Sequence, residues 1–130
     1  MQRTPIFLVA LLVALVSFGS CTGQTGGGAI DATAFAKAGA TPKAQLIDVR
    51  TAAEFREGHL QGARNLDWTN GDLERALNIL DKQAPVLLYC ASGRRSAAAR
   101  ATLLKAGFTD VRDLQGGIRA WAAQGLPVVH

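Results

Sequence analysis

The sequence predicts an α/β domain built on a mainly parallel sheet. From Ala29 onward, short apolar runs alternate with segments whose apolar residues recur at helical spacing. That alternation is typical of β–α units, in which a crossover helix brings the chain back to a parallel strand. The chain has 130 residues, of which 48% are hydrophobic, enough for one domain with its own core but too few for two. We therefore expect one domain over residues 29–130.

The elements of this domain are expected in a regular order. In chain order they are a helix at 32–38, a strand at 45–49, a helix at 52–56, a short strand at 62–66, a helix at 73–80, a strand at 85–89, a helix at 96–106, a strand at 111–114 and a helix at 118–123.

Capping residues mark the helices in the first half of the domain. Asp31 is placed to cap the first helix, which ends near Gly39. After the apolar strand at 45–49, Thr51 and Glu54 have the spacing of a capping box and start the second helix. Asp72 follows the loop at 67–71 and is expected to cap the third helix. The apolar stripe of that helix recurs at spacings of three and four, at Leu73, Ala76, Leu77 and Leu80.

The second half contains the clearest strand and the clearest helix. The strand at 85–89 is apolar throughout and opens with Pro85, which favours a central, buried position. The helix at 96–106 is rich in alanine, so it can pack closely on a sheet, with Leu103 and Leu104 as its larger contacts. Gly107 ends this helix, and Gly125 follows the last one as a C-terminal cap.

The N-terminus has the parts of a bacterial export signal. Arg3 supplies a positive charge, residues 6–18 form an apolar run, and small residues precede Cys21. An apolar run of 13 residues is shorter than the roughly 20 that a membrane-spanning helix needs. We therefore expect residues 1–20 to be a signal peptide.

Residues 18–21 resemble the lipobox of bacterial lipoproteins, although Phe18 stands where leucine is usual. The resemblance implies that Cys21 carries lipid and becomes the first residue of the mature protein. Residues 21–28 are short, polar and rich in glycine, as in a flexible tether. The protein would then be exported and lipid-anchored to the bacterial cell envelope, facing the periplasm or the exterior. The alternative is an ordinary cleaved signal beside an unrelated cysteine.

The chain has only two cysteines. If Cys21 carries lipid, Cys90 is the lone free thiol of an exported protein, either an inert buried residue or a reactive one.

Loss of Arg3 with the signal leaves 13 basic and 10 acidic residues, a net charge of +3. Without a basic run, this charge favours a small anionic ligand over nucleic acid. We expect a monomer with no metal and no cofactor.

The neighbours of Cys90 favour reactivity. Cys90 follows the clearest strand, and ligands of open α/β sheets bind at the carboxyl ends of strands. Gly93 lets the loop curl with its backbone N–H groups inward, and a helix beginning at Ser96 adds the positive end of its dipole. Such surroundings lower the pKa of a thiol. We expect Cys90 to be the nucleophile and the next six residues to bind its anionic substrate: Ala91, Ser92, Gly93, Arg94, Arg95 and Ser96.

Three segments resemble the signatures of the rhodanese-like domain. They are residues 46–63, with Asp48, Arg50 and a Gly-His-Leu-Gln-Gly-Ala run; residues 86–97 around Cys90; and residues 114–121, with the tail at 125–128. The resemblance covers roughly residues 29–129. It implies a central five-stranded parallel sheet with helices on both faces. It also implies a sulfurtransferase in which Cys90 accepts sulfane sulfur from a donor such as thiosulfate. The Cys90 persulfide then passes that sulfur to cyanide or a thiol.

Several other residues admit more than one interpretation. A cysteine with Asp48 and His59 elsewhere invites a catalytic triad, but a thiolate held by amides needs no general base. We expect Asp48 and Arg50 to organise hydrogen bonds near strand ends and His59 to bond within its own turn. Trp121 is expected in the core, whereas Trp68 lies in a loop that could reach the site.

Three other functions remain open. Cysteine phosphatases of the same architecture have five residues between the cysteine and an arginine, whereas here Ser96 occupies that position and the arginine comes one residue earlier. The loop is therefore short for phosphate and suits sulfur. A non-catalytic binding or sensing module is the second alternative. The third is thiol redox chemistry with a partner protein that supplies the second cysteine.

Overall fold

The structure, a computed structural model, describes residues 27–130. Its sheet has five strands in the order β1-β5-β4-β2-β3, and every neighbouring pair is parallel. The strands are β1 (Ala29–Ile30), β2 (Gln45–Asp48), β3 (Arg64–Asn65), β4 (Val86–Tyr89) and β5 (Val111–Leu114). The helices are α1 (Ala32–Gly39), α2 (Ala52–Glu57), α3 (Asp72–Ala76), α4 (Arg94–Lys105) and α5 (Gly117–Ala123). The predicted α/β class is confirmed.

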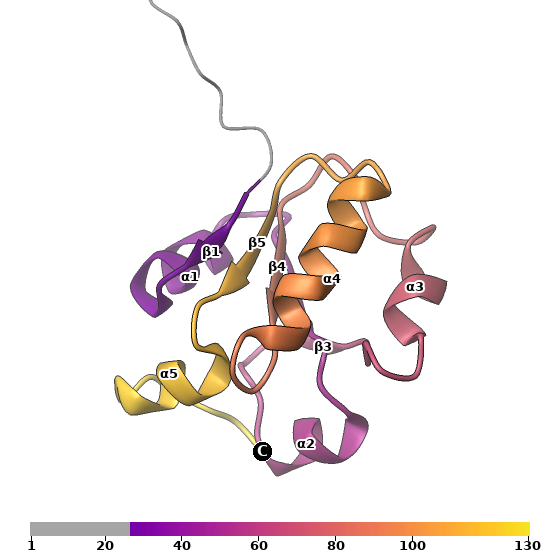
Figure 1. The fold of residues 1–130 in the computed structure, drawn as a ribbon. Coiled ribbons are helices and arrows are strands. Elements are labelled where there is room, and N and C mark those ends of the chain that lie inside the picture. Colours follow the sequence, from indigo (N-terminus) through magenta and orange to yellow (C-terminus); the bar gives the residue numbers. More distant parts are fainter. Residues whose placement is uncertain (1–26) are drawn as a thin grey trace, which may run out of the picture.

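Helices cover both faces of the sheet (Figure 1). One core cluster joins β4 to residues of α3 and α4, and the other joins it to residues of α1 and α5. Because side chains alternate along a strand, Leu88 and Cys90 belong to the first cluster and Leu87 and Tyr89 to the second. The side chain of Cys90 therefore points to the face that α4 covers.

The strand β4 occupies the centre of the sheet, as its apolar sequence predicted. It pairs with β2 on one side and β5 on the other, and all four of its residues are buried. The predicted caps of the first two helices are also present. Asp31 accepts a hydrogen bond from the amide of Ala34 at 2.8 Å. Thr51 and Glu54 make both bonds of the capping box.

Two predicted helix starts and one end were wrong. The helix α4 begins at Arg94 rather than Ser96, because Gly93 adopts a left-handed φ of 101° and serves as the N-cap. Gly71, also left-handed, caps α3, so Asp72 is the first residue of that helix rather than its cap. The helix also ends at Ala76, well before the predicted end. Burial of Leu80 in a following turn explains why the apolar stripe continues.

The strands at the edges of the sheet are short. The strand β3 has two residues instead of the predicted five. The strand β1, which pairs with β5, was not predicted from the sequence, because two residues carry no periodicity.

Within residues 27–130 no helix is long and apolar enough to cross a membrane. The predicted signal peptide and Cys21 lie outside the described residues.

Candidate active site

Cys90 lies at the carboxyl end of the central strand, where the sequence predicted a site. A short turn, residues 90–93, joins β4 to α4. The Sγ atom of Cys90 accepts a hydrogen bond from the backbone N–H of Gly93 at 3.1 Å. The hydroxyl of Ser96 lies 3.6 Å from the same sulfur. The thiol is thus surrounded by donors, with Cys90 only 1% exposed.

These donors favour the thiolate. Burial raises the pKa of the Cys90 thiol, since a charge is poorly solvated there. Hydrogen bonds from the Ser96 side chain and from the backbone amides of Ser96, Gly93 and Ser92 outweigh burial and leave the pKa below its ordinary value. The start of α4 contributes in the same direction, because the N-terminal end of a helix dipole is positive. Cys90 therefore has the surroundings of a reactive cysteine rather than an inert one.

The start of α5 holds the turn in this orientation. The backbone N–H of Ile118 donates to the carbonyl oxygen of Cys90 at 2.9 Å, and that of Arg119 donates to the carbonyl of Ala91 at 3.2 Å. Gly117 makes this approach possible. A Cβ at this position would lie 2.5 Å from the backbone of Cys90 and Ala91, and its φ of 62° is left-handed. With two loop carbonyls bound to α5, the loop N–H groups are available to the sulfur.

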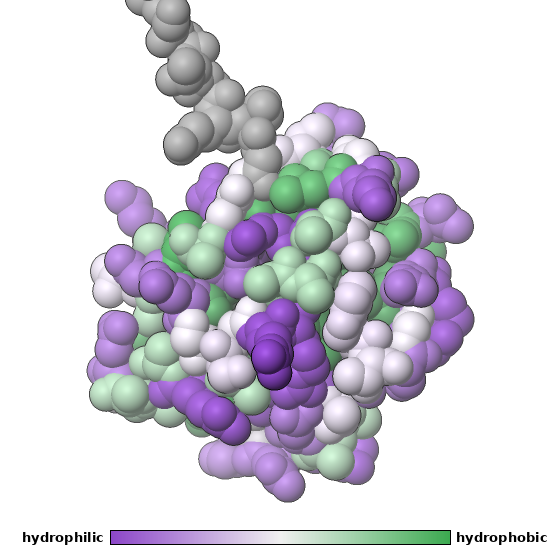
Figure 2. All heavy atoms as spheres, in the orientation of Figure 1, coloured by the Kyte–Doolittle hydropathy of each residue, from purple (hydrophilic) through white to green (hydrophobic). Residues whose placement is uncertain are grey.

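The two arginines that the sequence treats alike have different surroundings. Arg95 forms a two-pronged ion pair with Glu54 of α2, with N–O distances of 2.8 and 2.9 Å. Arg94 is exposed, and the part of the chain that the structure describes offers it no ion pair. Figure 2 shows hydrophilic side chains gathered over the start of α4, where both arginines lie.

Of the predicted substrate-binding residues, Ser92, Gly93 and Ser96 direct amide or hydroxyl groups to the sulfur. Ala91 instead uses its carbonyl oxygen to bind α5. Farther along α4, Arg100 forms another ion pair, with the buried carboxylate of Asp113 on β5. This ion pair connects α4 to the sheet.

The residues considered for a triad are engaged elsewhere. Asp48 and Arg50 form a buried ion pair at 2.7 Å, and Arg50 also donates to the carbonyl of Gly58 at 2.6 Å. The Nδ1 atom of His59 lies 2.9 Å from the carbonyl of Phe55, and the two rings are stacked. Both expectations, strand-end organisation and a local bond for His59, are confirmed. Within residues 27–130 no group of three or more His, Cys, Asp or Glu side chains could hold a metal ion.

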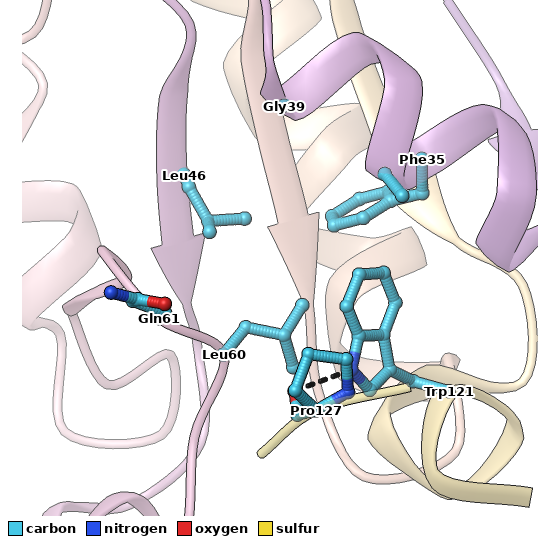
Figure 3. A pocket seen from close by; sticks show the side chains of 8 residues that line it. Phe35, Gly39, Leu46, Leu60, Gln61, Trp121 and Pro127 are labelled. Carbon is cyan, nitrogen blue, oxygen red and sulfur yellow. Dashed lines mark hydrogen bonds between the residues drawn. The ribbon is translucent and has the colours of Figure 1, made fainter. Parts of the chain in front are cut away.

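The two tryptophans lie on opposite faces of the sheet. Trp121 belongs to the core on the α1 and α5 face, as predicted, and its Nε1 donates to the carbonyl of Pro127 at 2.9 Å. It borders a mainly apolar pocket of about 160 Å³ that Phe35, Leu46 and Leu60 also line (Figure 3). This pocket opens on the face opposite Cys90. Trp68 packs against the cluster that contains Cys90.

Sequence reasoning did not assign Glu54 and Gly117 to the site. Glu54 was recognised as part of a capping box and of the first family signature, but not as a partner of Arg95, which lies 41 residues away. Gly117 lies within the signature at residues 114–121, which was a signal but indicated no role for it. A glycine pair at the start of the last helix was the available hint of a close backbone approach.

Comparison with known proteins agrees with this geometry. The family model described as Rhodanese-like domain matches residues 31–124. Thiosulfate sulfurtransferase 16, chloroplastic, of Arabidopsis thaliana is 40% identical over 93 residues, which cover 64% of this chain and 78% of that protein. The uncharacterized protein YqhL of Bacillus subtilis is 43% identical over 82 residues, covering 63% of this chain and 64% of YqhL, so the match spans slightly less than two thirds of that relative.

A solved structure shares the fold. The crystal structure of a rhodanese-related protein from Thermoplasma volcanium superposes with a TM-score of 0.69 at 30% identity, covering 78% of this chain and 96% of that one. Three findings point to the same family: the match to the family model, the five-stranded parallel sheet and the order of the three signatures. The chain belongs to the rhodanese-like family.

Proposed function

We propose that the protein is a sulfurtransferase that moves sulfane sulfur from an anionic donor such as thiosulfate to cyanide or a thiol. The observation that carries the proposal is the hydrogen bonding of Cys90, whose sulfur accepts from the Gly93 amide and faces the Ser96 hydroxyl. Donors that stabilise a thiolate also suit the terminal sulfur of a persulfide, because both are anionic. The 40% identity to a protein named thiosulfate sulfurtransferase supports the same reaction.

In the first step, the Cys90 thiolate attacks the outer sulfur of thiosulfate. A new S–S bond forms to Cys90, the S–S bond of thiosulfate breaks, and its electron pair leaves with sulfite. In the second step, cyanide attacks the outer sulfur of the persulfide. Thiocyanate forms, and the electron pair of the breaking S–S bond returns to Cys90 as thiolate. No proton has to be transferred in this pair of steps, which is consistent with a site built from amides rather than around a histidine.

The experiment is intact-mass spectrometry of the purified protein after exposure to thiosulfate. We expect a gain of one sulfur atom, its loss on addition of cyanide, and neither change in Cys90→Ser. Sulfite release measured in parallel checks the balance of the first step. A wild-type protein that gains no sulfur, or that gains it equally without Cys90, contradicts the proposal.

The phosphatase alternative is tested on the same sample with a generic aryl phosphate. The loop length argues against a phosphate site, because the arginine follows Cys90 one residue earlier than in the cysteine phosphatases, which leaves the loop short for a phosphoryl group. We expect no hydrolysis. Hydrolysis that disappears in Cys90→Ser, without sulfur uptake, would replace the sulfurtransferase proposal.

We also propose that the protein is exported and anchored through lipid on Cys21. The proposal rests on residues 1–28 of the sequence alone. Labelling of expressing bacteria with a fatty-acid analogue should mark the wild-type protein and leave Cys21→Ala unmarked. Two or three acyl chains anchor a protein stably, so the wild-type protein should fractionate with membranes. An unlabelled wild-type protein in the soluble fraction contradicts this proposal.

A further inference from the structure

Glu54 connects two helices that lie beside the Cys90 turn. It is in the first turn of α2, and its Oε2 atom accepts hydrogen bonds from the backbone N–H of Thr51 at 2.9 Å and the Thr51 hydroxyl at 3.0 Å. The same carboxylate accepts hydrogen bonds from both terminal nitrogens of Arg95, which lies in the first turn of α4. One side chain thus completes the capping box of α2 and holds an arginine of the active-site helix.

The charges around this contact are nearly balanced. Hydrogen bonds from Arg95 lower the pKa of Glu54 to about 2, so the carboxylate is ionised at neutral pH. Glu54 in turn raises the pKa of Arg95, and the negative charges of Cys90 and Asp67 contribute in the same direction. The Arg95 guanidinium therefore lies within electrostatic reach of the thiolate, but its positive charge is offset by an adjacent negative one.

We propose that Glu54 is a positioning residue of the Cys90 site: it fixes the Arg95 guanidinium beside the turn and offsets its charge, which leaves Arg94 to meet the anionic group of the donor. Two observations carry this assignment. The ion pair has near-ideal two-pronged geometry, which holds a guanidinium in one orientation. Both partners are also mostly shielded, with side-chain exposures of 26% and 31%, so solvent screens their charges less than those of a fully exposed pair.

The positioning role can be separated from the capping role. Glutamine serves in capping boxes as glutamate does, so Glu54→Gln retains the bond to the Thr51 amide while removing the negative charge. Thr51→Ala is the matched control, because it removes the side-chain cap and leaves Glu54 free to pair with Arg95. A purely structural Glu54 predicts that both variants affect stability alone.

The test is the rate of Cys90 alkylation by iodoacetamide as a function of pH, on the full domain. In Glu54→Gln the charge of Arg95 is no longer offset, so we expect alkylation about two- to threefold faster at pH values below the thiol pKa. In Arg95→Gln the remaining carboxylate repels the thiolate, so alkylation should be slower by a similar factor. The double variant should return close to the wild-type rate, and Thr51→Ala should leave the rate unchanged.

Two outcomes overturn the proposal. One is a rate profile of Glu54→Gln that superposes on the wild type or moves in the opposite direction. The other is an equal shift in Thr51→Ala, which would trace the effect to the cap. Circular dichroism and the denaturation midpoint establish that each variant is folded. Arg95→Gln, which leaves the capping box intact, carries the test if Glu54→Gln does not fold.

The part of the inference that concerns the donor rests on the proposed function and has its own measurement. Because Glu54→Gln removes a negative charge and makes the site more positive, the KM for thiosulfate should fall about two- to threefold. Arg94→Gln removes a positive charge and should raise this KM. Alkylation requires no sulfur transfer, so the two proposals can fail separately. A wild-type protein that takes up no sulfur refutes the function, and an unchanged alkylation profile refutes the role of Glu54.

Discussion

Substitution of Gly117 by alanine tests whether the start of α5 holds the Cys90 turn, residues 90–93. The added Cβ would lie 2.5 Å from the backbone of Cys90 and Ala91, too close for any side-chain atom. A left-handed φ costs a non-glycine residue roughly 1–2 kcal/mol. If α5 moves away to relieve the contact, the hydrogen bonds to the carbonyls of Cys90 and Ala91 weaken, at about 1 kcal/mol each. We expect Gly117→Ala to lower the free energy of unfolding by about 3–4 kcal/mol.

Gly125 supplies the matched control. Its φ of 73° is also left-handed, but a Cβ there would meet no atom within 4 Å. Gly125→Ala should therefore cost only the backbone strain, roughly 1–2 kcal/mol. The difference between the two variants, about 2 kcal/mol, isolates the contact with the Cys90 turn. For a domain of this size, that difference corresponds to a separation of about 8–16 °C in melting temperature.

The assay is guanidinium denaturation followed by tryptophan fluorescence, with Cys90 alkylation measured on the folded variants. Gly117→Ala should unfold at a lower denaturant concentration than Gly125→Ala and should alkylate more slowly at neutral pH, because a displaced turn no longer directs its amides to the sulfur. Equal midpoints and equal alkylation rates would refute the reasoning. A change in slope rather than midpoint would place the effect on the unfolded state instead.

Three further predictions concern buried polar groups. Asp48→Asn should lower the free energy of unfolding by about 3–5 kcal/mol in a denaturation experiment, because it leaves the buried guanidinium of Arg50 without its counter-charge; an unchanged midpoint would refute this. Tyr89→Phe should lower the free energy of unfolding by about 1–3 kcal/mol, because the buried backbone N–H of Leu60 loses the Tyr89 hydroxyl that it bonds at 3.0 Å. An unchanged free energy of unfolding would contradict this prediction. The hydrogen-bond donors of Cys90 lower the pKa of its thiol, so Ser96→Ala should raise that pKa. Alkylation of Cys90 should then slow about fivefold at pH values below the pKa and reach the wild-type rate well above it. An equal effect at all pH values would indicate steric hindrance instead.

Local signals in the sequence were sufficient for most of the secondary structure. The caps at Asp31 and Thr51 and the apolar strand of β4 depend on residues within a few positions of one another, and all three are present. The position of Cys90 was predictable for the same reason, because a cysteine that follows a buried parallel strand must lie at the carboxyl edge of the sheet. Boundaries were less certain where glycine was the cap. Gly71 and Gly93 start helices through left-handed backbone conformations that no side-chain pattern reveals.

The properties of the site, by contrast, depend on contacts between distant segments. The sequence by itself determined the fold class, the family resemblance and a cysteine beside two arginines. Only the tertiary structure decided that Arg95 is paired with Glu54 while Arg94 is exposed, and that Gly117 packs on the turn. The physical reason is that caps and periodicity act over one helical turn. Ion pairs and backbone contacts between α2, α4 and α5 exist only after the parallel sheet has brought their ends to one edge.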